Sequence, residues 1–210
     1  MSWTGAATCC LLASVASALC PRPEFSRYAL YARWLVFESD YAVVSTHHGQ
    51  SGVFGNTMRI SDGDGYEDST GVIYTYFPDL DATYVDLMAN SEVALTFTEM
   101  ALAGGASGGC KNSTAENPPC GRLTISGRLT RVPPEQEATA LKYLLSRHPE
   151  MKAWGKEHHF HHFWIAKGNI TDFFQIDMYG GAQHPKVEDY FAAPWHGGVA
   201  VGSSASPFRF

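Results

Sequence analysis

The 210-residue sequence predicts a mainly β, α+β fold, in which an antiparallel barrel carries peripheral helices. Short segments rich in β-branched and aromatic residues recur along the chain, and several of them alternate between apolar and polar positions. Segments with helical periodicity are few and do not alternate regularly with the strands, which disfavours a parallel sheet. A hydrophobic fraction of 45% without an internal repeat indicates one main domain.

The first half of the chain predicts two helices and four strands. A helix is expected over residues 25–36, where one apolar face comprises Tyr28, Leu30, Tyr31, Trp34 and Leu35. A second helix is expected over residues 79–88, with Asp79 or Asp81 as its N-cap and Asn90 at its end. The strands are expected at 41–46, 53–61, 71–77 and 93–98, with an Asp-Gly-Asp-Gly turn at 62–65.

The second half predicts a long strand, a helix and a hairpin. Residues 122–131 place Leu123, Ile125, Gly127 and Leu129 on one face, as expected for a sheet with one buried side. A helix should begin at the Pro133-Pro134 pair and end near His148. Its expected packing stripe comprises Ala138, Leu141, Leu144 and Leu145. Strands at 163–167 and 171–178, separated by Gly168-Asn169, are interpreted as a hairpin.

The two ends of the chain differ in composition from the domain between them. Residues 1–20 contain no Lys, Arg, Asp or Glu, have an apolar stretch at 9–19 and contain Ala16-Ser17-Ala18, which predicts a signal peptide. The alternative is a cytosolic chain with an apolar N-terminus. Residues 21–191 form the predicted domain, and the Gly-, Ser- and Ala-rich residues 192–210 are expected to be a flexible tail.

The cysteines favour an oxidising compartment. Cys110 and Cys120 enclose nine residues rich in Asn, Ser, Pro and Lys, so a loop disulfide is expected. A zinc pair is the alternative, although zinc cysteines usually lie two to four residues apart with a second ligand pair. Signal cleavage after Cys20 would leave an even pair, whereas cleavage after Ala18 would leave an odd thiol.

Two sequons and the net charge limit the possible partners. Asn112 and Asn169 each begin an N-x-S/T pattern at an expected turn, which predicts glycosylation if the chain enters the secretory path. Lys and Arg number 15 against 21 acids, a net charge of −6 that disfavours nucleic-acid binding. The apolar leader is too short for a membrane-spanning helix, so no membrane span is expected.

Candidate chemical sites are sparse. The run His-His-Phe-His-His at residues 158–162 suggests a metal site. Adjacent side chains of a strand point to opposite faces, however, so we expect a polar loop that leads into a strand instead. Asp62, Asp64 and Asp68 suggest a calcium loop, yet Ile73 occupies the position of the required glutamate. Nucleophile-elbow, Walker A and dinucleotide glycine motifs are absent from the sequence, so a typical hydrolase or kinase is disfavoured.

Several ordered motifs resemble the CREG family of secreted glycoproteins. They are Arg-His-Pro-Glu-Met-Lys-Ala-Trp at 147–154, Phe-Trp-Ile-Ala-Lys-Gly-Asn-Ile-Thr at 163–171 and Asp-Met-Tyr-Gly-Gly at 177–181. Weaker likeness extends the resemblance over residues 25–191. It implies a split β-barrel related to flavin-binding, pyridoxamine-phosphate-oxidase-like proteins, assembled as a homodimer with an obstructed flavin cleft. Asn169 matches a family glycosylation position, whereas the Gly-rich stretch at 104–109, the histidine run and the tail depart from the family pattern.

The resemblance favours a non-catalytic protein that binds a protein or glycan receptor and is secreted, lysosomal or vacuolar. No cofactor is expected under this hypothesis. The alternative is an FMN-dependent oxidoreductase, in which Arg59 and Ser61 would meet the flavin phosphate. A third and weaker hypothesis is metal storage or sensing by the histidine run.

Overall fold

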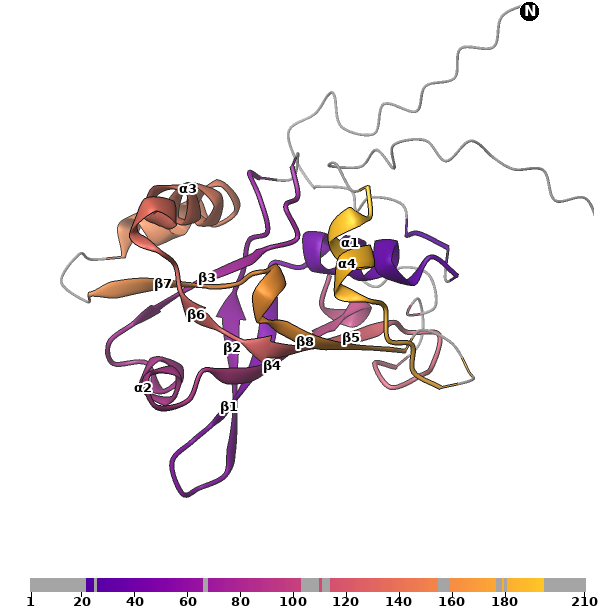
Figure 1. The fold of residues 1–210 in the computed structure, drawn as a ribbon, viewed down its shortest axis with the longest axis horizontal. Coiled ribbons are helices and arrows are strands. Elements are labelled where there is room, and N and C mark those ends of the chain that lie inside the picture. The colour runs from indigo at the N-terminus through magenta and orange to yellow at the C-terminus, as the bar shows by residue number, and fades with distance from the viewer. Residues whose placement is uncertain are drawn as a thin grey trace, which may run out of the picture.

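The computed structural model describes residues 22–24, 26–65, 68–102, 110, 114–154, 159–176, 179 and 181–194. Their strands form two antiparallel sheets that do not close into one cylinder (Figure 1). Sheet A has the order β2-β1-β4-β5-β8 and sheet B has the order β3-β7-β6. The strands are β1 (Tyr41–His47), β2 (Val53–Arg59), β3 (Ile73–Pro78), β4 (Glu92–Thr98), β5 (Arg122–Arg128), β6 (Thr130–Arg131), β7 (Phe160–Ile165) and β8 (Ile170–Ile176). The predicted antiparallel split barrel with peripheral helices is therefore confirmed.

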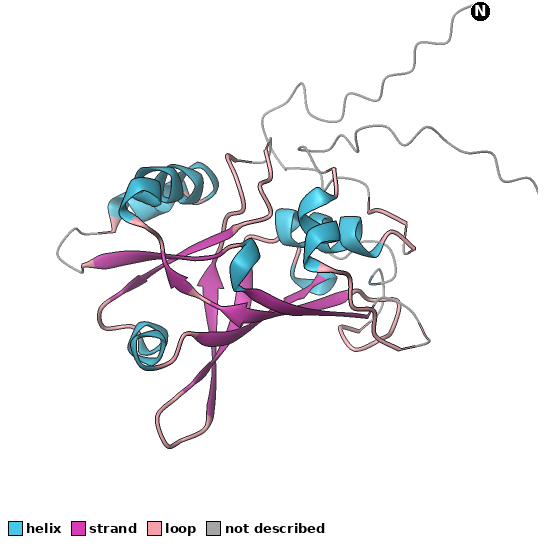
Figure 2. Ribbon diagram, viewed as in Figure 1, coloured by secondary structure: helices cyan, strands magenta, loops and turns pink. Residues whose placement is uncertain are grey.

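The described residues also form four α-helices, which lie at the periphery of the sheets (Figure 2). They are α1 (Tyr28–Glu38), α2 (Ala82–Ala89), α3 (Glu137–Arg147) and α4 (Val187–Ala192). Helices α1 and α4 pack side by side over sheet A, while α3 lies over sheet B (Figure 1). Among the described residues, no helix combines the length and the apolar character that a membrane span requires.

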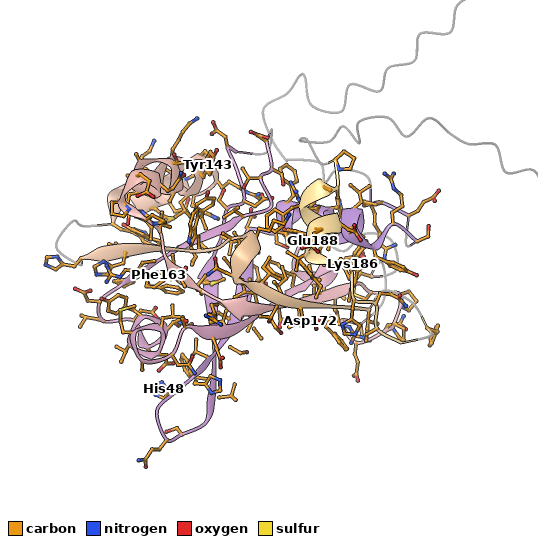
Figure 3. The ribbon with its side chains drawn as sticks, in the orientation of Figure 1. His48, Tyr143, Phe163, Asp172, Lys186 and Glu188 are labelled. Carbon is orange, nitrogen blue, oxygen red and sulfur yellow. A yellow bond between two sulfur atoms is a disulfide. The ribbon has the colours of Figure 1, made fainter. Side chains whose placement is uncertain are left out.

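The main core lies between α1 and the inner faces of the two sheets, where side chains fill the space between the ribbons (Figure 3). Its largest fully buried side chains include Trp34 from α1, Phe97 from β4 and Phe163 from β7. A second cluster beneath α3 contains Tyr74, Val132, Ala140, Leu144 and Met151. Helix α1 is buried all round from Leu30 to Glu38, so the prediction of a one-faced amphipathic helix was wrong. Because α4, β4 and the loop at 68–71 all reach α1, it has no solvent face over that length.

The structure has Asp81 as the N-cap of α2 and His148 at the end of α3, as the sequence predicts. The Asp81 side chain accepts a hydrogen bond from the Thr83 amide at 2.7 Å, and α2 ends at Asn90. A 3-10 turn, η3 (Pro134–Gln136), precedes α3, and His148 is the C-cap of α3. The expected packing stripe of α3 was only partly right. The inward residues are Ala140, Leu144 and Arg147, while Ala138 and Leu141 are exposed.

The predicted hairpin at 168–169 was wrong. Strand β7 pairs with β3 and β6 in sheet B, whereas β8 pairs with β5 in sheet A. The 3-10 turn η6 (Lys167–Asn169) therefore carries the chain from one sheet to the other. The same crossover approaches Gly127, where an added Cβ would lie 2.3 Å from the Asn169 carbonyl oxygen. Local alternation cannot distinguish a hairpin from a crossover, because both begin and end with a strand.

The long strand expected at 122–131 is divided between the two sheets. Strand β5 ends at Arg128 after an irregular register at Ser126 and Gly127, and β6 then joins sheet B. Leu129 lies between β5 and β6, and its backbone N–H donates a hydrogen bond to the Ser91 carbonyl at 2.9 Å. Helix α4, which the sequence analysis did not assign, packs Tyr190 against Phe173 of β8 and its neighbours in the main core.

Cys110 and Cys120 are joined by a disulfide, and both residues are buried. The next residue, Gly121, packs so closely against the Tyr31 hydroxyl that an added Cβ would overlap it at 1.5 Å. Glu99 is also fully buried there, and it accepts hydrogen bonds from Arg22 at 2.6 Å and from Tyr31 at 2.5 Å. The disulfide therefore closes a loop close to a part-buried ion pair, through which Glu99 holds Arg22 of the described N-terminal segment.

We predict that replacing both Cys110 and Cys120 by serine lowers the free energy of unfolding by about 3 kcal/mol. The physical reason is the loop-closure entropy regained by the unfolded chain when a ring of this size is opened. Urea unfolding of the protein and the double variant, each with and without reductant, measures the difference. Reductant should lower the stability of the protein and leave the variant unchanged; equal midpoints in all four samples would contradict the prediction.

Candidate functional site

A cavity of about 680 Å³ lies where the ends of β2 and β3 meet the start of β7 and the 3-10 helix η4 (Pro149–Ala153). This volume lies within the range typical of small-molecule pockets. Its wall is mainly aromatic and apolar, with three polar side chains. The apolar members are Tyr41, Met58, Tyr76, Phe77, Pro78, Met151, Trp154 and Phe160, and the polar members are Thr57, Arg59 and Asp81. We refer to it as the Arg59 cavity.

Three stacked rings form one wall of this cavity. The Tyr76 and Phe160 rings are 4.2 Å apart and almost parallel, at 7°. Trp154 stacks against Phe160 at 5.7 Å, and His162 stacks against Tyr76 at 5.0 Å. The register of β3 and β7 places Tyr76 directly opposite His162 and Pro78 opposite Phe160. The antiparallel pairing of sheet B thus builds the stack from residues that are far apart in the sequence.

The two residues proposed from the sequence to contact a flavin phosphate are in different environments. Arg59 is half-exposed in the cavity wall, with its Nε 3.2 Å from a Glu150 oxygen and its guanidinium carbon 4.9 Å from the Trp154 ring centroid. Ser61 is fully buried and donates its hydroxyl to the Gly63 carbonyl at 2.8 Å. The structure therefore does not bring the Arg59 guanidinium and the Ser61 hydroxyl together on one surface.

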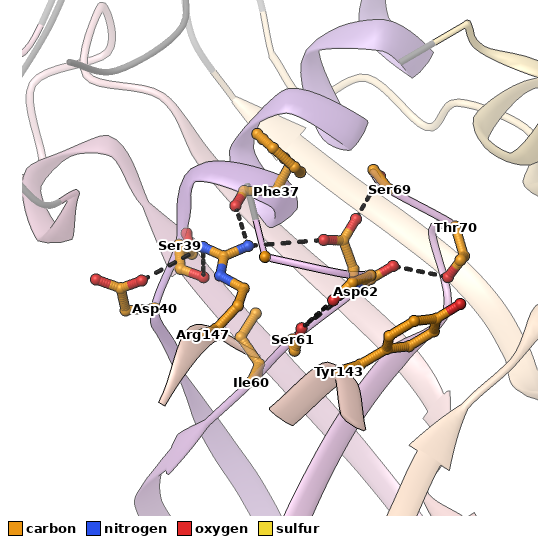
Figure 4. A network of polar contacts seen from close by, with 12 residues as sticks. Phe37, Ser39, Asp40, Ile60, Ser61, Asp62, Ser69, Thr70, Tyr143 and Arg147 are labelled. Atoms are coloured by element: carbon orange, nitrogen blue, oxygen red, sulfur yellow. Dashed lines mark hydrogen bonds and ion pairs between the residues drawn. The ribbon is translucent and has the colours of Figure 1, made fainter. Parts of the chain in front are cut away.

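A buried polar network lies behind the cavity (Figure 4). The Arg147 side chain is fully buried and donates to the Phe37 carbonyl at 2.6 Å and to the Ser39 carbonyl at 3.3 Å. It also forms ion pairs with Asp40 at 3.3 Å and Asp62 at 3.7 Å. These contacts join the end of α3 to the C-terminal end of α1, where unsatisfied carbonyls favour a cation.

Asp62 is the acid at the centre of this network. Its side chain accepts a hydrogen bond from Ser69, and its backbone carbonyl accepts from the Thr70 amide at 2.7 Å. Burial raises the pKa of Asp62, and the Ser69 hydrogen bond, Arg147 and Arg33 oppose that rise. Arg33 also donates to the Ser69 carbonyl at 2.8 Å. Of the three aspartates singled out as a possible calcium loop, Asp62 is buried in this network, whereas Asp64 pairs with Lys142 at 2.5 Å.

His148 joins the network to the cavity. A smaller polar pocket of about 310 Å³ shares Tyr41 and Arg59 with the Arg59 cavity and is also lined by His148 and Glu150. The His148 Nε2 lies 2.8 Å from the Ile60 carbonyl oxygen, so this nitrogen carries the proton and donates. Burial is the main cause that lowers the pKa of His148.

The histidine run is divided among several carboxylates. His158 lies outside the described residues, and His159 precedes β7. His161 pairs with Asp79 at 2.5 Å, while His162 on the opposite side of the strand pairs with Glu137 of α3. Within the described ranges, no cluster of three or more His, Cys, Asp or Glu side chains is arranged to hold a metal ion.

Of the two sequon asparagines, only Asn169 lies in the described part of the chain. It is half-buried at the end of η6, and its amide nitrogen lies 3.4 Å from the Thr130 hydroxyl. Asn112 lies outside the described residues, as do the predicted signal peptide and residues 195–210 of the predicted tail.

Two unclosed antiparallel sheets with external helices define a split-barrel protein of the α+β class. The solved heme binding protein from Mycobacterium smegmatis shares this fold, with a TM-score of 0.60 and 13% identity over 82% of this chain and 62% of that one. A pyridoxinephosphate oxidase family protein from Clostridium acetobutylicum gives a TM-score of 0.53 and 9% identity over 78% of this chain and 97% of that one. At these identities, the likeness shows the fold alone.

The family model described as CREG, beta-barrel matches residues 23–192, and the chain belongs to the CREG family. Protein CREG1 of Gallus gallus is 33% identical over 187 residues, which cover 86% of this chain and 92% of that protein. Protein CREG1 of Homo sapiens is 31% identical and covers 84% and 79% respectively. Protein CREG2 of Homo sapiens is 33% identical over 72% of this chain, and the match spans half of that longer protein.

Sequence reasoning missed the aromatic wall and the buried network. Trp154 and Phe160 were named from the sequence only as members of longer motifs. Their stacking with Tyr76 depends on the pairing of β3 with β7, which the sequence does not reveal. One sequence feature could have indicated the buried network. Arg147 is a cation in the last turn of a helix, directly before the His-Pro pair that ends the helix.

The depressed pKa of His148 predicts a pH-dependent contribution to stability. The folded state holds the neutral imidazole, so the contribution is present above the unfolded pKa of about 6.5 and is lost as the pH falls through the lower folded value. His148→Gln retains an amide donor for the Ile60 carbonyl but cannot titrate. We expect the free energy of unfolding to fall less between pH 7 and pH 5 in His148→Gln than in the protein itself. Chemical denaturation at each pH measures this, and parallel pH profiles would contradict it.

Proposed function

We propose that this CREG-family chain is a non-catalytic glycoprotein that acts as a homodimer by binding protein or receptor partners. We further propose that it enters the secretory path and functions outside the cell, in the lysosome or in the vacuole. The observation that carries the proposal is the outer face of sheet A, which is well suited to pair with a second copy.

Side chains alternate along the strands of sheet A, and the outward set is exposed or half-exposed. The register aligns this set into rows that cross all five strands. One row comprises Thr57, Val43, Thr96, Thr124 and Phe174, and the next comprises Gly55, Ser45, Ala94, Ser126 and Asp172. Asp172 is the one charged residue of these two rows, and it pairs with His184 at 3.0 Å.

Apart from Asp172, the residues of these rows are uncharged, so this face loses little hydration free energy when it is covered. Burying apolar area stabilises an interface by roughly 25 cal/mol per Å² before the costs of association. Half-exposed Val43 and Phe174 supply such area, while the threonine and serine hydroxyls can hydrogen-bond across a two-fold axis. Charged residues lie beyond these rows, as expected for the rim of an interface.

The Cys110–Cys120 disulfide and the position of Asn169 support a route through an oxidising lumen. Disulfides persist mainly in such compartments. Asn169 lies in a short turn with exposed Lys167 and Gly168 beside it, so a glycan at its amide would extend into solvent.

The FMN-dependent oxidoreductase remains the alternative, favoured by the volume and aromatic wall of the Arg59 cavity. The charges disfavour it, because a flavin phosphate would approach Asp81 and Glu150. Glu150 already neutralises Arg59, and Asp81 already caps the N-terminus of α2. The Ser61 hydroxyl faces the Gly63 carbonyl and is buried. We therefore propose that no flavin is bound.

Thr124→Arg should convert the dimer to a monomer, because it places a charge and a long side chain at the centre of the outer face. We expect dissociation to become at least about tenfold more favourable, which corresponds to about 1.4 kcal/mol. Sedimentation velocity over a concentration series measures it. Ala138→Arg on the exposed side of α3 is the matched control and should remain dimeric. A monomeric wild-type protein, or an unaffected Thr124→Arg dimer, would refute the proposed interface.

Protein purified from a secretory host should be colourless and glycosylated. Its visible spectrum should lack a flavin band, and an amidase that removes N-glycans should increase its electrophoretic mobility. Asn169→Gln should lose one glycan by mass spectrometry relative to the unmodified sequence. A stoichiometric flavin band would favour the oxidoreductase, and an unglycosylated product would argue against the secretory route.

A further inference from the structure

A second cavity of about 460 Å³ lies between α3, η4 and β7. It shares Met151 and the Tyr76, Trp154 and Phe160 wall with the Arg59 cavity, but its remaining lining residues differ. Leu141 and Leu145 come from α3, and Lys152 comes from η4. We refer to it as the α3 cavity.

The apolar side of this cavity lies at the edge of the second hydrophobic cluster, where Leu145 and Trp154 pack against the cluster but remain partly exposed. Helix α3 buries Ala140 and Leu144 against the second hydrophobic cluster, whereas Leu141 is 40% exposed and Leu145 is half-buried. These two leucines lie four residues apart, on one side of the helix. Together with the Trp154 and Phe160 rings, they form an apolar groove that an apolar molecule would shield from water.

Apart from the Tyr76 phenol, the ionisable side chains of the α3 cavity are basic, whereas those of its neighbours include carboxylates. The basic side chains are Lys152, His159 and His162, and no carboxylate is among the described lining residues of the α3 cavity. The Arg59 cavity contains Asp81, and the small polar pocket beside it contains Asp40 and Glu150. On a chain of net charge −6, this lining selects for an anionic group.

His162 supplies an independent observation that points to a ligand. Its Nδ1 is hydrogen-bonded to the Glu137 carboxylate. Its Nε2 is shielded from solvent and has no hydrogen-bond partner in the described part of the chain. A buried polar atom without a partner is costly, and it gains a bond when a ligand supplies one. A carboxyl group can do so in either protonation state, by donating its proton to Nε2 or by accepting the Nε2 proton.

We propose that the α3 cavity binds an apolar carboxylic acid. The apolar body lies among Leu141, Leu145, Trp154 and Phe160, and the carboxyl group meets Lys152 and His162. Neither the dimer nor the secretory route is needed for this site, so its test is independent of the proposed function.

The test uses cis-parinaric acid, a fluorescent fatty acid whose emission rises in apolar surroundings, with dodecanoic acid and dodecanol as competitors. We expect saturable enhancement with the full chain. Dodecanoic acid should displace the probe about tenfold more effectively than dodecanol, because the two share an apolar chain and differ in the carboxyl group. Lack of saturable binding, or equal competition by the acid and the alcohol, would overturn the proposal.

Two pairs of variants locate the site. Lys152→Met should weaken binding of dodecanoic acid about tenfold, whereas Lys186→Met should not change it. Figure 3 shows Lys186 on the other side of the molecule from Tyr143 of α3. Leu141→Glu should weaken acid binding more than Leu141→Gln, since the two substitutions differ only in charge. Thermal unfolding verifies that each variant is folded, and unchanged affinity in folded Lys152→Met and Leu141→Glu would exclude this cavity.

Discussion

The rest of the structure depends on the buried Arg147 guanidinium. It donates hydrogen bonds to carbonyl oxygens at the end of α1 and forms ion pairs with Asp40 and Asp62. These contacts join α3 to α1 and to the turn that follows β2 (Figure 4). A guanidinium out of water is stable only when neighbouring carboxylates and carbonyl oxygens compensate its charge. Asp62 in turn depends on these partners. Burial disfavours its charged form, and Ser69, Arg147 and Arg33 favour that form. Moving α3 away from α1 or from the turn after β2 would therefore leave the buried Arg147 guanidinium without its carbonyl and carboxylate partners.

The position of Arg147 also determines where residues of the two cavities lie, because α3 and η4 are adjacent in the sequence. Arg147 is the last residue of α3, and η4 begins two residues later with Pro149. Fixing Arg147 and the His148 hydrogen bond to Ile60 therefore positions Met151 and Trp154, which line both cavities. The stack of Trp154, Phe160 and Tyr76 then separates a cleft with mixed charges from one without carboxylates. The same rings thus line two cavities whose charged residues differ.

Much of the fold was predictable because its signals are local. Strand alternation placed β1, β3, β4 and β5 within a few residues, and the aspartate and proline signals located α2 and α3. The CREG resemblance was carried by contiguous motifs, and the family is shown. The failures involve partners that are distant in sequence. The alternation at 122–131 continues across the change of sheet at Leu129, and Gly168-Asn169 has a turn composition whether the chain reverses or crosses over. Burial of Arg33 and Glu38 in α1 was likewise invisible, because charged residues normally mark a solvent face.

The sequence by itself determined the class of fold, most element positions and the family, since these depend on periodicity, capping residues and ordered motifs. The tertiary structure alone decided which strands share a sheet, that Arg59 pairs with Glu150 while Ser61 is buried, and that the histidines at 161 and 162 meet separate carboxylates. It also turned Leu141 and Leu145 from an expected packing stripe into the wall of a cavity. The physical reason is that periodicity specifies which face of an element is apolar, whereas the surface that meets that face is set by the packing of segments remote in the chain.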